Sequence, residues 1–368
     1  MKLKPQRDAR RSHARILTRR NAPQSDYLLN DRDFRFSAEC ERMRVDRNGS
    51  VLSMLLIRLA PPHDAPGDVA FLARVLEGRL RITDTPGRLD DGRIAVLLPD
   101  TDADGAWKVA TDLSEVYPPG PERPECEVLV YPPRQRGRET MHVDLGESQA
   151  GTLPESVENA EGSEMFFARP TSKLKRAVDV AGATVGLALA TPVVLAAAAA
   201  IKLTSPGPAF FRQEREGRGG RRFHIWKLRT MCLDAEHQKS HLLAHNHQDG
   251  PAFKMRRDPR TTRVGRFLRW SSIDELPQFW NVLRGEMSLV GPRPLPTDES
   301  QACLNWQRRR LDVLPGMTCT WQVSGRGRVR FDEWVRMDLR YAARPSMWRD
   351  VKLMLVTLPS VLIQRGMR

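Results

Sequence analysis

Two adjacent acidic residues, Asp274 and Glu275, stand just ahead of Pro277 and are the residues best placed to do chemistry in this chain. Proline disfavours helical geometry in the residue before it and suits the first position of a helix, so we predict a helix from about Pro277 to Arg284. Both carboxylates would then lie beside the positive end of that helix, where an anion is favoured. Such a carboxylate can act as a nucleophile or as a ligand for a divalent cation.

The same two acids also have a purely structural interpretation. Ser272 and Glu275 have the spacing of a capping box, in which the side chains only satisfy backbone N–H groups at the start of a helix. Nearby arginines favour chemistry, since Arg269 lies five residues before Asp274 and Arg293 is held between two prolines. A stiff loop that presents one guanidinium suits recognition of a pair of phosphate oxygens. Acids that can hold a divalent cation, together with fixed arginines, therefore predict phosphoryl-transfer chemistry.

The overall composition points to an anionic partner. The chain has 368 residues and a formal net charge of +14, which is expected for a protein that meets nucleic acid, anionic lipid or a phosphorylated substrate. Its five cysteines are odd in number and include no Cys-x-x-Cys pair, so they are interpreted as reduced thiols rather than a disulfide framework or a zinc site. The basic start of the chain has no apolar run, so no signal peptide is expected.

One apolar segment stands out against this polar background. Residues 180–201 are 22 residues without a charge, and at about 1.5 Å per residue they could cross a hydrocarbon core of roughly 30 Å. Lysine and arginine flank both ends, so the positive-inside rule favours both ends on the cytoplasmic side. Pro192 removes a helical hydrogen bond near the middle. We therefore predict that residues 171–204 form a re-entrant membrane helix that enters, bends and returns; a single straight span is the alternative.

The remaining sequence predicts an α+β protein with several parts. Residues 1–33 are expected to be a disordered basic arm, and residues 132–170, rich in Gly, Pro, Glu and Ser, a linker with a short strand near 165–167. Between them, the residues from 34 to 131 fit a compact βαββαβ unit of the ferredoxin-like type. Its predicted strands cover residues 51–59, 80–83, 94–98 and 127–131, and its helices residues 68–77 and 102–116. At the end of the chain, the apolar residues 353–363 fit either an interfacial helix or a packed terminal helix.

A first resemblance concerns the N-terminal unit. Residues 88–101, Arg-Leu-Asp-Asp-Gly-Arg-Ile-Ala-Val-Leu-Leu-Pro-Asp-Thr, resemble the core of a GGDEF (diguanylate cyclase) domain. Asp-Asp-Gly-Arg-Ile stands where that family has Gly-Gly-Asp-Glu-Phe, and Arg58 stands where it has a metal-binding acid. Without the glycines the backbone cannot approach phosphates closely, and without the acids no metal is held. The resemblance implies a degenerate, catalytically inactive module with a regulatory or oligomeric role; an unrelated ferredoxin-like domain is the alternative.

A second resemblance covers more than half of the chain, from about Lys173 onward. The motifs that carry it follow one another along the sequence: Pro206-Gly207-Pro208, Gln213-Glu214-Arg215, Lys227-Leu228-Arg229-Thr230-Met231, Asp258-Pro259-Arg260, Asp274-Glu275-Leu276-Pro277-Gln278, Leu289-Val290-Gly291-Pro292-Arg293-Pro294 and Gln322-Val323-Ser324-Gly325-Arg326. Together they resemble the bacterial sugar transferases, a family of monotopic polyprenyl-phosphate phosphoglycosyl transferases. Residues 205–368 are accordingly expected to form the catalytic domain.

The resemblance implies a two-step reaction and assigns roles to the residues. Asp274 would attack the β-phosphate of a UDP-sugar, release UMP and form a phosphosugar-aspartate, which the phosphate of a membrane polyprenyl (undecaprenyl) carrier then attacks. Asp274 and Glu275 would be the catalytic residues, with Glu275 holding Mg²⁺ against the diphosphate. The implied phosphate-binding residues are Lys227, Arg229, Arg269 and Arg293.

The same resemblance implies a place and a set of partners. The protein is expected at the bacterial inner (cytoplasmic) membrane as a monotopic enzyme, its catalytic domain facing the cytoplasm, starting exopolysaccharide or O-antigen biosynthesis. UDP-sugar, polyprenyl phosphate and inner-membrane lipid are the expected partners, a homodimer is a further expectation, and no nucleic acid is expected because the basic arm lacks interleaved aromatic residues. The main rival is a membrane-anchored cyclic-dinucleotide-binding regulatory protein without transferase activity; a nucleic-acid-binding protein rests on charge alone.

Overall fold

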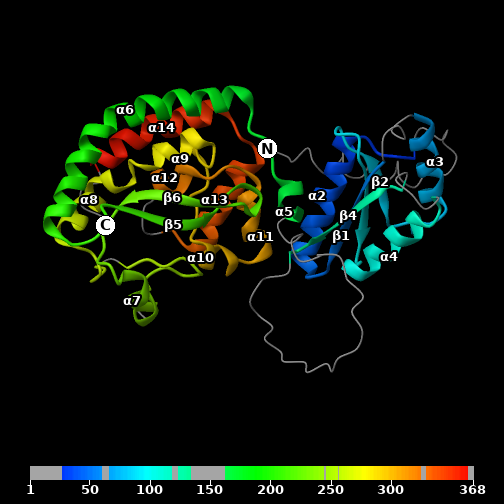
Figure 1. Cartoon of the computed structure of the whole chain (residues 1–368), viewed down its shortest axis with the longest axis horizontal. Coiled ribbons are helices and arrows are strands. Elements are labelled where there is room, and N and C mark those ends of the chain that lie inside the picture. The colour runs from blue at the N-terminus through cyan, green and yellow to red at the C-terminus, as the bar shows by residue number, and fades with distance from the viewer. Residues whose placement is uncertain are drawn as a thin grey trace. The chain divides into compact units, whose positions relative to one another are not determined.

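The computed structural model describes most of the chain and divides it into two compact units, with the division between Ser163 and Glu164. The described residues are 27–59, 66–117, 123–133, 162–243, 246–255, 257–324 and 329–363. Most of the predicted basic arm and of the predicted linker therefore lie outside the described residues. The mixture of helix and sheet fits the predicted α+β class (Figure 1).

The first unit is built on one four-stranded sheet. Its elements are α2 (Asp31–Asn48), β1 (Leu52–Arg58), α3 (Pro66–Glu77), β2 (Thr85–Arg88), β3 (Ile94–Pro99), α4 (Ala103–Ser114) and β4 (Glu125–Tyr131). The strands lie in the order β2-β3-β1-β4, and every neighbouring pair is antiparallel. Leu52 to Ile57 of the central strand β1 are buried without interruption, as expected for a strand covered on both faces.

Three local predictions in and near this unit need correction. The helix α2 begins at Asp31, inside the predicted arm, because Asn30 caps it by accepting a hydrogen bond from the backbone of Asp33. The strand predicted at 80–83 is wrong, since a strand needs a neighbour and β2, which pairs with β3, starts only at Thr85. The strand predicted at 165–167 is also wrong: this segment lies in the helix α5 (Gly162–Phe167). A short apolar run does not distinguish strand from helix.

The second unit contains one long helix and many short elements around two small sheets. They are α6 (Lys173–Thr204), β5 (Phe210–Glu216), η4 (Arg218–Gly220), β6 (Arg222–Leu228), α7 (Ala235–Leu242), α8 (Arg263–Ser271), η6 (Ile273–Glu275), α9 (Gln278–Arg284), β7 (Ser288–Val290), α10 (Thr297–Gln301), α11 (Asn305–Arg308), η7 (Arg309–Asp312), β8 (Gly316–Thr318), α12 (Thr320–Ser324), α13 (Phe331–Ala343) and α14 (Met347–Ile363). The strands β5 and β6 form an antiparallel hairpin, and β7 and β8 form a parallel pair.

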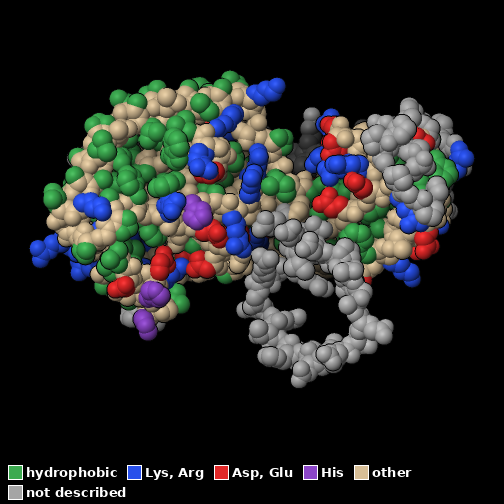
Figure 2. Space-filling view, viewed as in Figure 1, with side chains coloured by type: hydrophobic (Ala, Val, Ile, Leu, Met, Phe, Trp, Pro, Cys, Tyr) green, Lys and Arg blue, Asp and Glu red, His purple; other side chains and the backbone are tan. Residues whose placement is uncertain are grey.

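The long helix α6 is continuous through Pro192, and Figure 1 shows it turning from the top of its unit down the left edge. Several of its large apolar side chains are exposed; among them are Val185 at 60%, Leu189 at 73%, Leu195 at 62% and Leu203 at 87%. Figure 2 shows hydrophobic side chains spread over the part of the unit that carries this helix. Within the described part of the chain, α6 is long and apolar enough to cross a membrane, judged by length and composition.

The other face of α6 is docked on the unit through small residues and polar anchors. A Cβ built on Gly186 would lie 2.7 Å from ring atoms of Phe279 in α9, so only glycine allows this approach. Near its start, Arg176 donates hydrogen bonds of 2.6 and 2.7 Å to the carbonyls of Val282 and Leu283. Carbonyls in the last turn of a helix lack partners within the helix, so the arginine satisfies groups of α9 that would otherwise need water.

The terminal helix α14 is packed along one side. Leu353 is buried against Val290 and Tyr341, and the carboxylate of Asp350 accepts hydrogen bonds from Lys175 at 2.7 Å and from the Tyr341 hydroxyl at 2.9 Å. Other side chains, including Trp348 and Leu355, are exposed. The helix therefore combines features of both expectations: it packs on the unit and leaves apolar residues at the surface.

Replacing Gly186 by valine should destabilise the second unit because the new side chain would overlap the Phe279 ring. Overpacking of this kind costs about 1–3 kcal/mol, which exceeds the few tenths that valine gains over glycine in helix propensity. Thermal unfolding in detergent measures the effect. Ala188→Val, on an exposed position of the same helix, is the matched control and should leave Tm unchanged. Adding Phe279→Ala to Gly186→Val should recover part of the loss, and an equal Tm for both single variants would refute the contact.

Candidate active site

The acidic pair lies in a single turn between two helices. The helix α8 ends at Ser271, and the next residue, Ser272, has a φ of 59° that breaks the helical path. The single turn η6 then carries Asp274 and Glu275, and Pro277 stands directly before α9. The helix after Pro277 was predicted correctly. Ser272 makes no side-chain cap at the turn that follows, so the capping-box interpretation is wrong. Asp274 is only 7% exposed, which places a carboxylate in a mostly desolvated turn.

Glu275 is held by two cations from distant parts of the sequence. Lys227, near the end of β6, donates a hydrogen bond of 3.3 Å to its Oε1 atom, and Arg293, in the segment after β7, forms an ion pair with the same oxygen. All three side chains are mostly shielded from solvent. The structure thus brings together three of the predicted site residues, and it places them beside Asp274.

Burial and charge together set the electrostatics of this cluster. Burial lowers the pKa of Lys227 to about 8, although the neighbouring Glu275 opposes the shift. The Glu275 carboxylate raises the pKa of Arg293. A third cation, Arg215 in β5, has its pKa lowered to about 10, first by burial and then by the charge of Arg293. The cluster therefore concentrates positive charge in a region with little solvent.

Asn281 fixes the acidic turn to the strand that carries Lys227. Its Oδ1 atom accepts a hydrogen bond of 3.0 Å from the backbone of Trp226, and its Nδ2 atom donates one of 2.7 Å to the carbonyl of His224. The same Nδ2 atom donates to Glu286 at 2.7 Å. Asn281 is completely buried, so these bonds set the position of α9 against β6 without competition from water.

A second anchor holds the segment of Arg293. Arg310 donates a hydrogen bond to the backbone carbonyl of Arg293 and forms an ion pair of 3.0 Å with Asp338. Trp334 donates its indole N–H to the same carboxylate at 3.0 Å. Burial raises the pKa of Asp338 to about 6, with Arg310 opposing the shift. The backbone around Arg293 is therefore tied to α13.

The other two predicted phosphate-binding residues have different surroundings. Arg229 donates to the carbonyl of Ser205 at 3.0 Å, to its hydroxyl at 2.6 Å and to the carbonyl of Pro206. These groups follow the end of α6, where carbonyls need donors, so the described contacts of Arg229 connect β6 to that helix. Arg269 donates to the hydroxyls of Thr230 at 2.9 Å and Thr261 at 3.3 Å.

Two residues that were not predicted lie in the site. A small pocket is lined by Arg215, Ile225, Lys227, Gln278, Arg293, Pro294 and Gly316. Arg215 and Gln278 both belong to motifs that the sequence displays, but spacing gave no reason to select them among their neighbours. Arg215 is held at this pocket by a hydrogen bond of 2.7 Å that it donates to the carbonyl of Pro294.

The oxygen ligands available for a metal are those of Asp274 and Glu275. Among the described residues, no group of three or more His, Cys, Asp or Glu side chains could hold a metal ion. Both described ion pairs of Glu275 fall on its Oε1 atom. Mg²⁺ commonly takes one or two protein carboxylates and completes its shell with water and substrate phosphates. The donor set therefore fits Mg²⁺ only together with a phosphorylated ligand.

Replacing Asn281 by leucine should destabilise the second unit strongly. The leucine keeps the branched shape but removes the amide, so the backbone N–H of Trp226 and the carbonyl of His224 lose their partner at a completely buried position. Each unsatisfied buried group costs about 1–3 kcal/mol. We expect a loss of about 2–5 kcal/mol, seen as a lower Tm in thermal unfolding in detergent. Gln238→Leu, on an exposed position of α7, is the control for the same kind of change and should have no effect. A Tm for Asn281→Leu equal to that of the control would contradict the anchoring role.

The second half of the chain is similar to known proteins. A family model described as "Bacterial sugar transferase" matches residues 170–364. The chain is 47% identical over 193 residues to "Galactosyl transferase CpsE" of Streptococcus agalactiae (52% of this chain, 43% of that protein). It is 48% identical over 198 residues to "UDP-glucose:undecaprenyl-phosphate glucose-1-phosphate transferase" of Caulobacter vibrioides (51% and 69%), and 37% identical over 196 residues to "Exopolysaccharide production protein ExoY" of Rhizobium meliloti (52% and 87%).

The extent of these matches differs between proteins. The chain spans less than half of the length of the streptococcal relative. Among solved structures, it is similar to diguanylate cyclase SiaD of Pseudomonas aeruginosa, with 22% identity, a TM-score of 0.26, and coverage of 34% of this chain and 54% of that one. The family model covers more than half of the chain and includes the acidic pair and the three cations Lys227, Arg293 and Arg215 near it. The chain belongs to the bacterial sugar transferase family.

Proposed function

We propose that this protein transfers a sugar-1-phosphate from a UDP-sugar to a membrane polyprenyl phosphate, as the first step of exopolysaccharide or O-antigen biosynthesis. The observation that carries the proposal is the buried Asp274 beside the partly buried Glu275, which forms ion pairs with Lys227 and Arg293. A carboxylate nucleophile beside fixed cations suits attack on phosphorus, because the cations offset the negative charge that develops on the phosphoryl oxygens.

The two steps balance on one aspartate. In the first, a carboxylate oxygen of Asp274 attacks the β-phosphorus of the UDP-sugar, the bond from that phosphorus to the bridging oxygen breaks, and UMP leaves with that oxygen. In the second, a phosphate oxygen of the polyprenyl phosphate attacks the same phosphorus and the Asp274 carboxylate leaves, which gives a polyprenyl-diphosphate-sugar. Lys227 and Arg293 bind and orient the phosphoryl oxygens, and the bonds of Asn281 and Arg310 keep these two cations in register with the nucleophile.

We propose Mg²⁺ as the cofactor, held by Glu275 and by the diphosphate of the substrate. When bound, it would neutralise charge on the diphosphate and on the departing UMP. The support for this assignment is the chemistry of the donor set, a carboxylate directly beside the nucleophile. Glu275 would exchange part of its pairing with Lys227 and Arg293 for the metal when the substrate enters.

The names of the relatives support the transferase over the regulatory alternative. The relative from Caulobacter vibrioides is named as a UDP-glucose:undecaprenyl-phosphate glucose-1-phosphate transferase, and that from Rhizobium meliloti as an exopolysaccharide production protein. Both are similar to the half of the chain that contains the acidic pair. A cyclic-dinucleotide-binding regulator without transferase activity would not require a buried carboxylate such as Asp274 next to the cations Lys227 and Arg293.

We also propose that α6 is a re-entrant membrane helix at the inner membrane and that the catalytic part faces the cytoplasm. Its support is the exposed apolar surface of α6, the proline within it and the basic residues that flank it. Because the other face of α6 packs on α9, the helix would hold the acidic turn near the interface where a lipid phosphate lies. Membrane lipid would then contact the whole exposed apolar face of α6.

For the N-terminal unit we propose a ferredoxin-like domain that derives from a GGDEF domain and has lost catalysis. The element order βαββαβ and the strand order β2-β3-β1-β4 support this fold. In the turn between β2 and β3, Asp91 forms an ion pair of 2.7 Å with Arg93, and this arginine lowers the pKa of Asp91. An acid already neutralised by its neighbour is poorly suited to hold a metal ion.

The nucleophile can be tested by intact-protein mass spectrometry. After incubation with the correct UDP-sugar and Mg²⁺ but no lipid acceptor, the wild-type protein should gain the mass of one phosphosugar, on the peptide that contains Asp274. Asp274→Asn keeps the size but removes the anion, so it should gain no mass and release no UMP. The correct sugar is found first by screening UMP release across UDP-sugars.

The neighbouring acid supplies the comparison. Glu275→Gln keeps the nucleophile and weakens Mg²⁺ binding, so it should form the intermediate slowly and respond to high magnesium. Losses of about 10²–10⁴-fold are typical when a supporting catalytic group is removed, whereas loss of a covalent nucleophile closes the route. An Asp274→Asn protein that still gains the phosphosugar mass, or turns over at the wild-type rate, would sink the mechanism.

The topology is tested by cysteine labelling in cells. In a background without the five native cysteines, Pro170→Cys and Leu203→Cys place one thiol at each end of α6, both at exposed positions. For a re-entrant helix, a membrane-impermeant maleimide should label neither site from the periplasmic side and both sites after lysis. Labelling of one end from outside would replace the re-entrant helix with a simple span.

A further inference from the structure

The pocket beside the acidic turn contains buried hydrogen-bond donors that the protein itself does not satisfy. Gln278, at the start of α9, is 3% exposed, and among the described residues its Nε2 atom has no hydrogen-bond partner. The Nε atom of Arg215 is likewise buried and unsatisfied within the described part of the chain. A buried donor without an acceptor costs about 1–3 kcal/mol, so two of them in one pocket call for a ligand that accepts.

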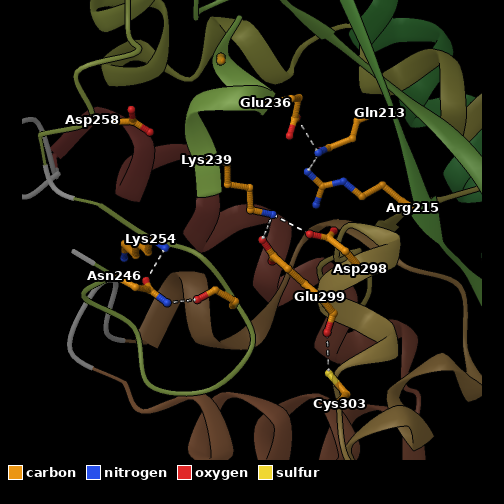
Figure 3. A network of polar contacts seen from close by, with 12 residues as sticks. Gln213, Arg215, Glu236, Lys239, Asn246, Lys254, Asp258, Asp298, Glu299 and Cys303 are labelled. Atoms are coloured by element: carbon orange, nitrogen blue, oxygen red, sulfur yellow. Dashed lines mark hydrogen bonds and ion pairs between the residues drawn. The ribbon is translucent and has the colours of Figure 1, made fainter. Parts of the chain in front are cut away.

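The two terminal nitrogens of the Arg215 guanidinium are held by hydrogen bonds, which fixes the orientation of the Nε donor. One terminal nitrogen donates to the carbonyl of Pro294 at 2.7 Å and the other to Gln213 at 2.6 Å. Gln213 in turn donates a hydrogen bond of 3.1 Å to the carboxylate of Glu236 (Figure 3). The guanidinium is therefore oriented before any ligand arrives, and Arg215 lines the pocket together with Gln278, Lys227 and Arg293.

The lining specifies the charge and shape of the ligand. Among the described residues that line the pocket there are three cationic side chains and one amide, and no acid. The polar side chains of the lining carry three positive charges and offer a cation one neutral amide oxygen, that of Gln278, so the pocket is unsuited to a metal ion. A phosphoryl group carries several acceptor oxygens and negative charge, and can satisfy charged and neutral donors together.

We propose that this pocket is a phosphoryl-binding subsite in which Gln278 Nε2 and Arg215 Nε are ligand donors additional to Lys227 and Arg293. This assignment rests on the proposed function, because Gln278 lies four residues after the proposed nucleophile Asp274 in the sequence. The Gln278 amide is a neutral donor, so it can bind phosphoryl oxygens without forming an ion pair with the Asp274 carboxylate. The group bound can come from the diphosphate of the UDP-sugar or from the polyprenyl phosphate.

Binding of inorganic pyrophosphate without metal tests the subsite independently of turnover. With the full chain in detergent, pyrophosphate at about 100 times its Kd should raise the wild-type Tm by about 5–10 °C for a unit of this size. Gln278→Leu keeps the approximate volume and removes the donor, so it should weaken pyrophosphate binding by about 10–150-fold, the equivalent of one hydrogen bond to a charged group. Because no catalysis is involved, a protein that fails to turn over UDP-sugars can still pass or fail this test.

The stability of the free protein separates a ligand donor from a structural residue. Since Nε2 of Gln278 is unsatisfied, Gln278→Leu should leave the ligand-free Tm unchanged or raise it. Gln307 is the matched control: it is equally buried, but it donates to Asp332 at 2.9 Å and accepts from the backbone of Leu304 at 2.8 Å. Gln307→Leu should therefore lower the ligand-free Tm and keep the full pyrophosphate shift.

Two further probes identify the source of the phosphoryl group. If Gln278→Leu loses the stabilisation by UDP, the subsite takes the sugar-nucleotide diphosphate; if it loses the stabilisation by farnesyl phosphate, it takes the lipid phosphate, and either loss supports the proposal. The proposal is overturned if pyrophosphate does not stabilise the wild type, or if Gln278→Leu binds all three probes as tightly as the wild type. A lower ligand-free Tm for Gln278→Leu with unchanged binding would likewise assign Gln278 to the fold alone.

Discussion

The ion pairs of Glu275 with Lys227 and Arg293 are the interaction on which the rest of the second unit depends. A charged cluster shielded from water is favourable only when its geometry is held accurately, because desolvation opposes it. The surrounding structure supplies that accuracy from three sides. Asn281 holds the turn against β6, Arg310 holds the backbone of Arg293, and Arg215 holds the neighbouring carbonyl of Pro294.

The long apolar helix is part of the same construction. Gly186 allows close contact with Phe279 of α9 and Gly182 with Leu289 of β7. The first turns of the helix carry polar residues that reach into the unit. Arg176 caps α9, Lys175 pairs with Asp350 at 2.7 Å, and Asp179 accepts hydrogen bonds from Ser288 and Leu289. The basic residues before the apolar segment 180–201, which served as topology signals in the sequence, therefore also bind the helix to the catalytic elements. A shift of α6 would move α9, and with it the acidic turn.

The fold was predictable wherever local patterns decide structure. The strand at 94–98 and the helix after Pro277 follow from apolar runs and proline chemistry, and both exist with nearly the expected bounds. The prediction failed at 80–83, which form a turn because the strand that pairs with β3 starts only at Thr85. It failed at 165–167 because a few apolar residues fit strand and helix equally. The helix α2 was missed because its charged sequence resembles a solvated arm, and its buried residues Phe34, Ala38 and Val45 are recognisable only once the sheet is in place.

The sequence by itself determined the family, the class α+β, the acidic pair and a set of four candidate cations, because these rest on residue types in short motifs. Only the tertiary structure decided which cations meet the pair. Lys227 and Arg229 stand two residues apart in one motif, yet Lys227 reaches Glu275 while Arg229 donates to carbonyls at the end of α6. Gln278 and Arg215 enter the site for the same reason: whether a buried donor finds an acceptor depends on the segments packed around it, and those segments are far away in the chain.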